Sequence, residues 1–125
     1  MLFRPEASAP AMGRRILDGL SDRFAPSLLD DARLLLTELV TNAIQHGRLD
    51  GRDRISVTVH LEADCVLVEV ADPGEGFPAT GGRQPGTGSG WGLALVDRLA
   101  DEWGVEPLLP EGGTLAWFRL IQRDG

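Results

Sequence analysis

The sequence predicts an α+β fold, a two-layer sandwich in which three helices cover one face of a mainly antiparallel mixed sheet. The expected elements follow the order helix, helix, two strands, glycine-rich loop, helix and two strands. This order lacks both the regular βαβ alternation of a parallel sheet and any internal repeat. The chain has 125 residues and is 42% hydrophobic. That is enough to bury a core without disulfides or metals, so we expect one domain over residues 1–125.

Two helices are expected in the first half of the chain. From Pro5 to Phe24, apolar residues recur at the four-residue spacing of an amphipathic helix. Pro26-Ser27 offers a break and an N-cap for a second helix from Leu28 to His46, which Gly47 closes. Leu2-Phe3 would form a short edge strand before the first helix.

The second half of the chain supplies most of the strands. The segment Ile55–Leu61 alternates apolar and polar residues, as a half-buried strand does. The segment Val66–Ala71 is more continuously apolar, which indicates a central strand paired with the previous one as a hairpin. After a glycine-rich stretch, a helix is expected from near Trp91 to Trp103, where the next glycine stops it. The strands Val105–Leu109 and Thr114–Ile121 would follow.

Composition excludes several kinds of protein. The net charge is −7, so nucleic acid would repel the chain and direct binding to it is not expected. All twelve basic residues are Arg, which rules out the lysine of the usual phosphate loop. Cys65 is the single cysteine, and no apolar run is long enough for a signal peptide or a membrane span. We therefore expect a cytoplasmic protein with no membrane partner.

The long helix carries a pair of polar residues that could bind a metal ion or take part in catalysis. Its core stripe would comprise Ala32, Leu35, Leu39 and Ala43. Glu38 and Asn42 lie one turn apart on the border of this stripe and project from the same side. An amide oxygen is a suitable ligand for Mg²⁺, and a carboxylate beside it can deprotonate or orient a hydroxyl or water. A polar pair alone is more often a solvated helix flank, so this feature needs support from others.

Two glycine-containing segments provide that support. Asp72 lies where a buried strand ends, followed by Pro73-Gly74-Glu75-Gly76, and from there a carboxylate can accept a hydrogen bond from an amino group such as that of adenine. The segment Gly86–Gly92 runs directly into a helix, so its bare backbone N–H groups could cradle phosphates. Each feature alone is also read as a good turn or a flexible loop. Their order and spacing along the chain carry more weight.

Three segments together resemble the GHKL, or histidine-kinase-like, ATPases of the Bergerat fold. Thr37–Gly47 (TELVTNAIQHG) looks like their N box, Val70–Phe77 (VADPGEGF) like their first glycine box and Gly88–Val96 (GSGWGLALV) like their second. Leu99–Gly104 (LADEWG) and Gly112–Phe118 (GGTLAWF) resemble the compact branch of anti-sigma-factor serine/threonine kinases. The resemblance covers the chain from the second expected helix to its end.

The resemblance implies a role for individual residues. Asn42 would bind Mg²⁺, Glu38 would act as the catalytic base or orient water, and Asp72 would contact the adenine amino group of ATP. Thr114 would help Asp72 to hold the adenine. Other residues would contact ATP through their backbone. The chain would pass close to the base at Gly74 and Gly76. Backbone N–H groups would face the phosphates at Gly88, Gly90, Gly92 and Leu93. The loop before them would close as an ATP lid, with Arg83 as a candidate phosphate contact.

Three functional hypotheses follow. The first is a protein serine/threonine kinase that uses ATP and Mg²⁺ and acts as an anti-sigma factor, with a sigma factor and a small antagonist protein as the partners that the resemblance implies. The second is a non-catalytic module that binds its partners in an ATP-dependent way. The third is the ATPase domain of a two-component sensor, which ranks last because 125 residues leave no room for a dimerisation helix pair. The family resemblance also suggests a homodimer.

Overall fold

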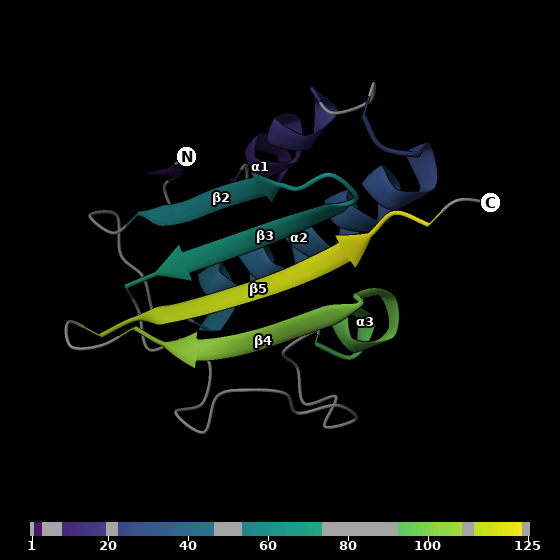
Figure 1. Cartoon of the computed structure of the whole chain (residues 1–125). Coiled ribbons are helices and arrows are strands. Elements are labelled where there is room, and N and C mark those ends of the chain that lie inside the picture. The colour runs from purple at the N-terminus through teal and green to yellow at the C-terminus, as the bar shows by residue number, and fades with distance from the viewer. Residues whose placement is uncertain are drawn as a thin grey trace.

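The computed structural model describes residues 2–3, 9–19, 23–46, 54–73, 93–108 and 112–123. In Figure 1 these residues form five strands and three helices in the chain order β1-α1-α2-β2-β3-α3-β4-β5. The helices are α1 (Ala9–Asp18), α2 (Pro26–His46) and α3 (Leu93–Leu99). The strands are β1 (Leu2–Phe3), β2 (Ile55–Leu61), β3 (Cys65–Asp72), β4 (Glu102–Pro107) and β5 (Thr114–Ile121).

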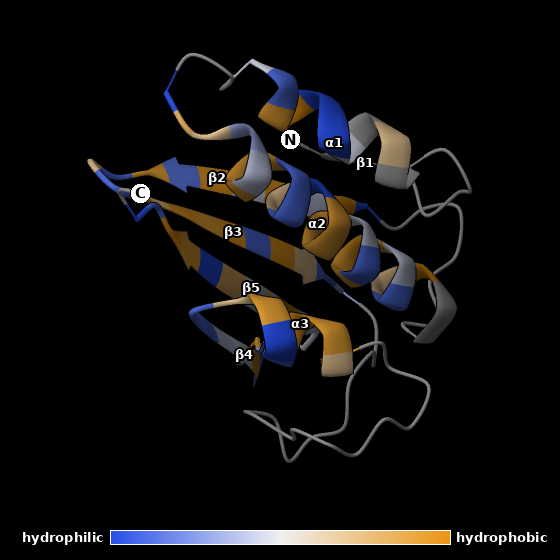
Figure 2. Cartoon of the chain, turned by 90° about the vertical axis from the view of Figure 1, so that its right-hand side faces the viewer, coloured by the Kyte–Doolittle hydropathy of each residue, from blue (hydrophilic) through white to orange (hydrophobic). Residues whose placement is uncertain are grey.

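The strands form one sheet in the spatial order β1-β2-β3-β5-β4. All four pairings between these described strands are antiparallel, and β2 and β3 form the expected hairpin. The three described helices lie on one side of the sheet, and none of them covers the other face, which is called the open face below (Figure 2). The expected two-layer α+β fold is therefore confirmed, including the short edge strand at Leu2-Phe3.

The hydrophobic core lies between α2 and the middle of the sheet. The expected stripe on α2 is buried throughout, at 1% exposure or less for Ala32, Leu35, Leu39 and Ala43. On β5 every second side chain points to the same layer, and Phe118 is fully buried. Because a strand alternates its faces, its other side chains lie on the open side of the sheet.

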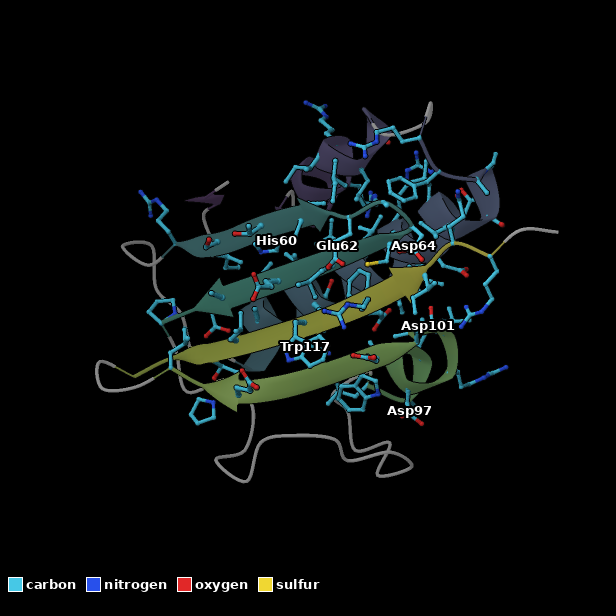
Figure 3. All side chains as sticks on the ribbon, in the orientation of Figure 1. His60, Glu62, Asp64, Asp97, Asp101 and Trp117 are labelled. Carbon is cyan, nitrogen blue, oxygen red and sulfur yellow. The ribbon has the colours of Figure 1, made fainter. Side chains whose placement is uncertain are left out.

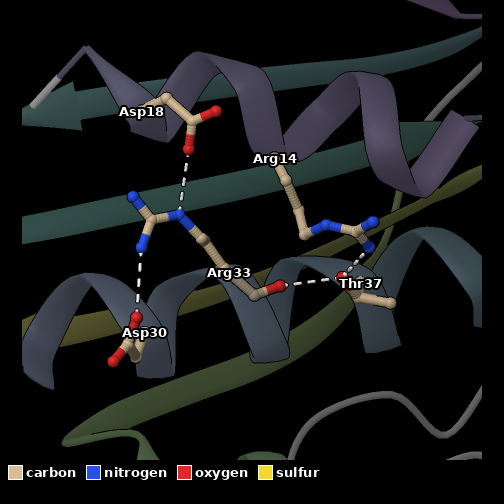
Figure 4. Close-up of polar contacts among 5 residues, drawn as sticks. All are labelled: Arg14, Asp18, Asp30, Arg33 and Thr37. Atoms are coloured by element: carbon tan, nitrogen blue, oxygen red, sulfur yellow. Dashed lines mark hydrogen bonds and ion pairs between the residues drawn. The ribbon is translucent and has the colours of Figure 1, made fainter.

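Polar contacts hold α1 along α2 (Figure 4). The Arg14 guanidinium donates to Thr37 Oγ1 at 2.8 Å, and the Thr37 hydroxyl donates to the Arg33 carbonyl oxygen at 2.8 Å. Arg33 also pairs with Asp18 at 3.0 Å and with Asp30 at 3.2 Å. These groups are partly exposed, so each ion pair contributes only about 0.2–1 kcal/mol. They fix the position of α1 more than they stabilise the fold.

The boundaries of the first two helices differ from the expected ones. The first is shorter, since α1 ends at Asp18, and Phe24 lies outside it as a buried core residue. The expected N-cap at Ser27 is wrong, because α2 already begins at Pro26. Proline is suited to the first turn, where no helical hydrogen bond needs its missing N–H. The Ala25 carbonyl oxygen instead accepts the first helical bond, from the Leu29 N–H at 3.1 Å.

The third helix was expected to be longer than it is. It ends at Leu99, and Trp103, which was placed on the helix, lies in β4 with the glycine that follows it. The turn between them is fixed by the sheet, since the Asp101 N–H donates to the Arg119 carbonyl oxygen at 2.9 Å. Pairing with β5 overrides the helix-forming character of this segment. The expected strand Val105–Leu109 correspondingly starts earlier, at Glu102.

Gly104 is a packing position and not a helix stop. Trp117, on the open face of the sheet (Figure 3), covers it so closely that a Cβ atom at residue 104 would lie 2.7 Å from the indole Nε1. Gly19, just after α1, has open space around the corresponding position. The absence of a side chain at Gly104 therefore lets the indole lie flat on β4.

We predict that Gly104→Ala destabilises the protein by about 1–3 kcal/mol, because the indole must move away from its strand. Urea denaturation followed by tryptophan fluorescence measures this loss. Gly19→Ala is the matched control and should change the free energy of unfolding by about 0.5 kcal/mol or less. Equal losses in both variants would show that Trp117 does not press on residue 104.

Candidate functional site

The position of α2 against the sheet determines where its polar residues lie. The Ala25 N–H, just before α2, donates to Gln122 Oε1 at 2.6 Å, which places the start of the helix at the end of β5. Asn42 is the seventeenth residue of α2, about 24 Å from its start. The eight residues of β5 span about the same 24 Å in the opposite direction. Asn42 therefore lies near the start of β5, where Thr114 is. Figure 1 shows α2 running behind the sheet from the end of β5 towards its start.

Asp72 lies at the same end of the sheet. It is the last residue of β3 and pairs directly with Thr114, the first residue of β5. In the part of the chain that the structure describes, the buried polar or charged side chains are Asn42, Asp72 and Thr114, each 3–4% exposed. Burying such groups costs free energy unless they find partners. Their gathering at one end of the fold marks this end as the candidate site.

Asn42 has a side-chain donor without a partner. Among the described residues, its Nδ2 is buried and makes no hydrogen bond. Leaving a buried donor unsatisfied costs about 1–3 kcal/mol. An amide offers both a donor and an acceptor, so it suits a ligand that combines an anionic oxygen with a hard cation. A nucleotide phosphate bound with Mg²⁺ is such a ligand, and Asn42 fits it.

Glu38 lies one turn before Asn42 on α2 and is partly exposed. This agrees with the expected arrangement, in which a polar border runs beside a buried stripe. A carboxylate in that position can be reached from solvent, whereas Asn42 is enclosed. The two side chains are thus suited to different tasks, one at the surface of the site and the other inside it.

Leu93 is the first residue of α3, and its side chain is buried in the hydrophobic core. Its predicted contact with phosphate involves the backbone N–H, so the packing of the side chain does not interfere. The other predicted phosphate and base contacts lie outside the described residues, namely Gly74, Gly76, Gly88, Gly90, Gly92 and Arg83. They stay predictions.

One contact near this segment was not expected from the sequence. The indole N–H of Trp103 in β4 donates to Asp97 Oδ1 in α3 at 2.9 Å. This hydrogen bond ties the short helix to the edge of the sheet, and α3 carries Leu93. From the sequence Trp103 is expected on the helix itself, so it is not predicted as a partner for the helix.

A hollow of about 240 Å³ lies at the opposite end of the sheet. It is lined by residues of the α2 start, the α3–β4 turn and the β5 end, including Asp31, Asp101, Gln122 and Arg123. Asp101 accepts a hydrogen bond from the Ile121 N–H at 2.7 Å and pairs with Arg123 at 2.6 Å (Figure 3). Burial raises the pKa of Asp101, but these hydrogen bonds outweigh it and lower the pKa overall. The contacts already use the carboxylate within the fold, so the hollow is the weaker candidate.

The described residues hold no group of three or more His, Cys, Asp or Glu side chains placed to bind a metal ion. Nor does any helix among these residues have the length and apolarity to cross a membrane.

We predict that Asn42→Leu leaves the ligand-free protein as stable as the wild type or more stable, by up to about 2 kcal/mol. The reason is that leucine has a similar volume and removes a buried donor that has no partner among the described residues. Urea denaturation without nucleotide measures the change. A loss of stability above about 1 kcal/mol would show that the amide serves the fold and is not reserved for a ligand.

Two comparisons with known proteins find similarity to protein kinases. The serine-protein kinases RsbW of Bacillus cereus (strain AH187) and Bacillus mycoides (strain KBAB4) are each 26% identical to this chain, over 99% of it and 85% of their own length. The nucleotide-free catalytic domain of histidine kinase ThkA superposes with a TM-score of 0.62 at 17% identity, over 98% of this chain and 96% of that domain. This likeness shows the fold.

A third comparison concerns the family as a whole. The family model for the histidine kinase-like ATPase domain matches residues 5–119, which is nearly the whole chain. This range contains the three buried polar residues and both glycine-rich segments. The chain belongs to the histidine kinase-like ATPase domain family.

Proposed function

We propose that this protein is an ATP-binding serine/threonine kinase that acts as an anti-sigma factor and phosphorylates a small antagonist protein, thereby regulating transcription. The observation that carries this proposal is the gathering of Asn42, Asp72 and Thr114 at one end of the fold, with an amide donor left without a partner among the described residues. The names of the RsbW relatives support the kinase activity.

Asp72 would recognise the base. Its carboxylate is buried beside Thr114, at the end of a central strand, and can accept a hydrogen bond from the 6-amino group of adenine. A hydrogen bond to a charged group contributes about 1.5–3 kcal/mol, twice or more the value of a neutral one. Thr114 would support this contact from the neighbouring strand.

Asn42 would hold the phosphate end of ATP together with Mg²⁺. When bound, the cation would neutralise charge on the phosphates as the γ-phosphoryl group is transferred. The Asn42 amide oxygen is a suitable ligand for it. The backbone N–H groups of Gly88, Gly90, Gly92 and Leu93 would face the phosphates, with Gly74 and Gly76 near the base.

Glu38 would accept the proton of the attacking hydroxyl. The acceptor of a protein kinase belongs to another protein, so the base must be accessible from outside. Glu38 meets this requirement, because it is partly exposed and lies one turn from Asn42. Positioning and charge neutralisation would supply most of the remaining rate enhancement.

The partners that we propose are proteins. A sigma factor and an antagonist with a Ser or Thr acceptor would bind near the mouth of the site, and a homodimer is the proposed assembly. The net charge of −7 argues against direct contact with nucleic acid.

We predict that Asp72→Asn weakens the binding of ATP with Mg²⁺ roughly 10- to 150-fold, since the charged hydrogen bond to adenine is lost. Isothermal titration calorimetry measures the affinities. The control is Asp64→Asn, an exposed carboxylate at the other end of the β2–β3 hairpin, which should bind ATP like the wild type. A folded wild type that does not bind ATP would refute the proposed function.

We predict that Glu38→Gln slows phosphoryl transfer by about 10²- to 10⁴-fold and leaves the dissociation constant of ATP within about threefold. Transfer of radiolabelled γ-phosphate to Ser or Thr of candidate antagonist proteins measures the rate. Asp31→Asn, on the same border of α2 two turns earlier, is the matched control. If the wild type binds ATP and no antagonist is ever labelled, the protein is a non-catalytic ATP-dependent binding module.

A further inference from the structure

Two glycines form the turn that leads into β5. Gly112 has a φ angle of 92° and Gly113 one of 110°, so both adopt a backbone conformation that residues with a side chain rarely enter. The Leu108 N–H donates to the Gly113 carbonyl oxygen at 3.0 Å, and the Gly112 N–H donates to the Leu108 carbonyl oxygen at 2.8 Å. The turn is therefore fixed to the end of β4.

The two glycines differ in what surrounds them. A Cβ atom at Gly112 would meet no atom of the described residues within 4 Å. A Cβ atom at Gly113 would overlap the carbonyl oxygen of Asp72 and would lie 3.1 Å from Pro73 Cα and 3.3 Å from the Asp72 carbonyl carbon. All three are backbone atoms, so no rotation of a side chain can relieve the contact. The chain at Asp72 and Pro73 must move if residue 113 gains a side chain.

This contact lies at the buried carboxylate of the candidate site. Asp72 ends β3 and pairs with Thr114, the residue directly after Gly113. The Asp72 side chain is 3% exposed, so its carboxylate has little freedom to compensate for a displaced backbone. A hydrogen bond weakens steeply as its length and angle leave the favoured range. A shift of about 1 Å is enough to lose most of a positioned contact.

We propose that Gly113 is a positioning residue for base recognition. Its bare Cα lets the end of β3 rest directly on the turn, and this close approach sets the Asp72 carboxylate where it can accept a hydrogen bond from a 6-aminopurine. Selectivity for adenine over a 6-oxopurine then depends on residue 113 as well as on Asp72. The inference rests on the proposed function, because it assumes that ATP binds at this end of the fold.

The test compares ATP with inosine triphosphate, which carries a 6-oxo group in place of the 6-amino group. The dissociation constants of both, with Mg²⁺, are measured by calorimetry for the wild type, Gly113→Ala and Gly112→Ala. The two variants introduce the same methyl group at a positive φ angle, but only the first presses on Asp72. Thermal unfolding without nucleotide records the cost to the fold in each.

The wild type should prefer ATP over inosine triphosphate by roughly ten- to hundredfold. Gly112→Ala should keep this ratio within about twofold, and in Gly113→Ala it should fall to about threefold or less, mainly through weaker binding of ATP. If Gly113→Ala keeps the wild-type ratio, the inference is wrong although the proposed function stands. If the wild type binds neither nucleotide, the proposed function itself fails.

A second variant covers the case in which Gly113→Ala does not fold. In Pro73→Gly/Gly113→Ala, the chain after Asp72 is freed and can move away from the new methyl group, so the fold can accommodate it. Its preference for ATP should still be about threefold or less, while Pro73→Gly alone keeps most of the wild-type preference. A double variant that discriminates like Pro73→Gly alone would overturn the inference.

Discussion

The packing of α2 against β3 and β5 is the interaction on which the rest of the structure depends. Leu35, Leu39 and Val40 on this helix are 0–1% exposed, and each fully buried aliphatic side chain contributes about 1.5–3 kcal/mol. The same contact sets the lengthwise register of the helix on the sheet, because Ala25 is tied to Gln122 at one end. Asn42 is thereby carried to the other end, where β3 stops and β5 begins. The core thus places the candidate site as well as stabilising the fold.

The two ends of this layer differ in how their polar groups are satisfied. At the end near Gln122, the Asp101 carboxylate accepts a hydrogen bond from the Ile121 N–H and pairs with Arg123, so its hydrogen-bonding capacity is met within the fold. At the end near Thr114, the described residues leave the Asn42 Nδ2 atom without a partner in a buried position. A fold selected for stability alone gains nothing from such a donor. The difference favours the second end as the place where a ligand binds.

Much of this arrangement follows from local patterns, and the errors at Trp103 and Gly104 share one cause. The apolar stripe on α2 and the alternation in Ile55–Leu61 are properties of single segments, so periodicity predicts them. Trp103 was placed on a helix because its segment has helix-forming residues followed by a glycine, yet pairing with β5 draws it into β4. Likewise Gly104 resembles a helix stop, and only Trp117 from a neighbouring strand explains it. Contacts between distant segments decide these positions, and no window of the sequence contains them.

The same reasoning explains why the sequence points to Asp72 as a candidate and not to Gly113, which contacts it. Asp72 follows directly after an apolar run, so the local sequence alone shows an acidic residue at the end of a buried strand. Gly113 is 41 positions away along the chain and looks like any turn glycine. Its neighbour Gly112 shares its positive φ angle, so turn geometry accounts for both glycines equally well. Only the approach of the Asp72 carbonyl oxygen distinguishes them, because it leaves no room for a side chain at Gly113. Where the backbone has no room to yield, a residue far away in the sequence can therefore fix the position of a buried side chain.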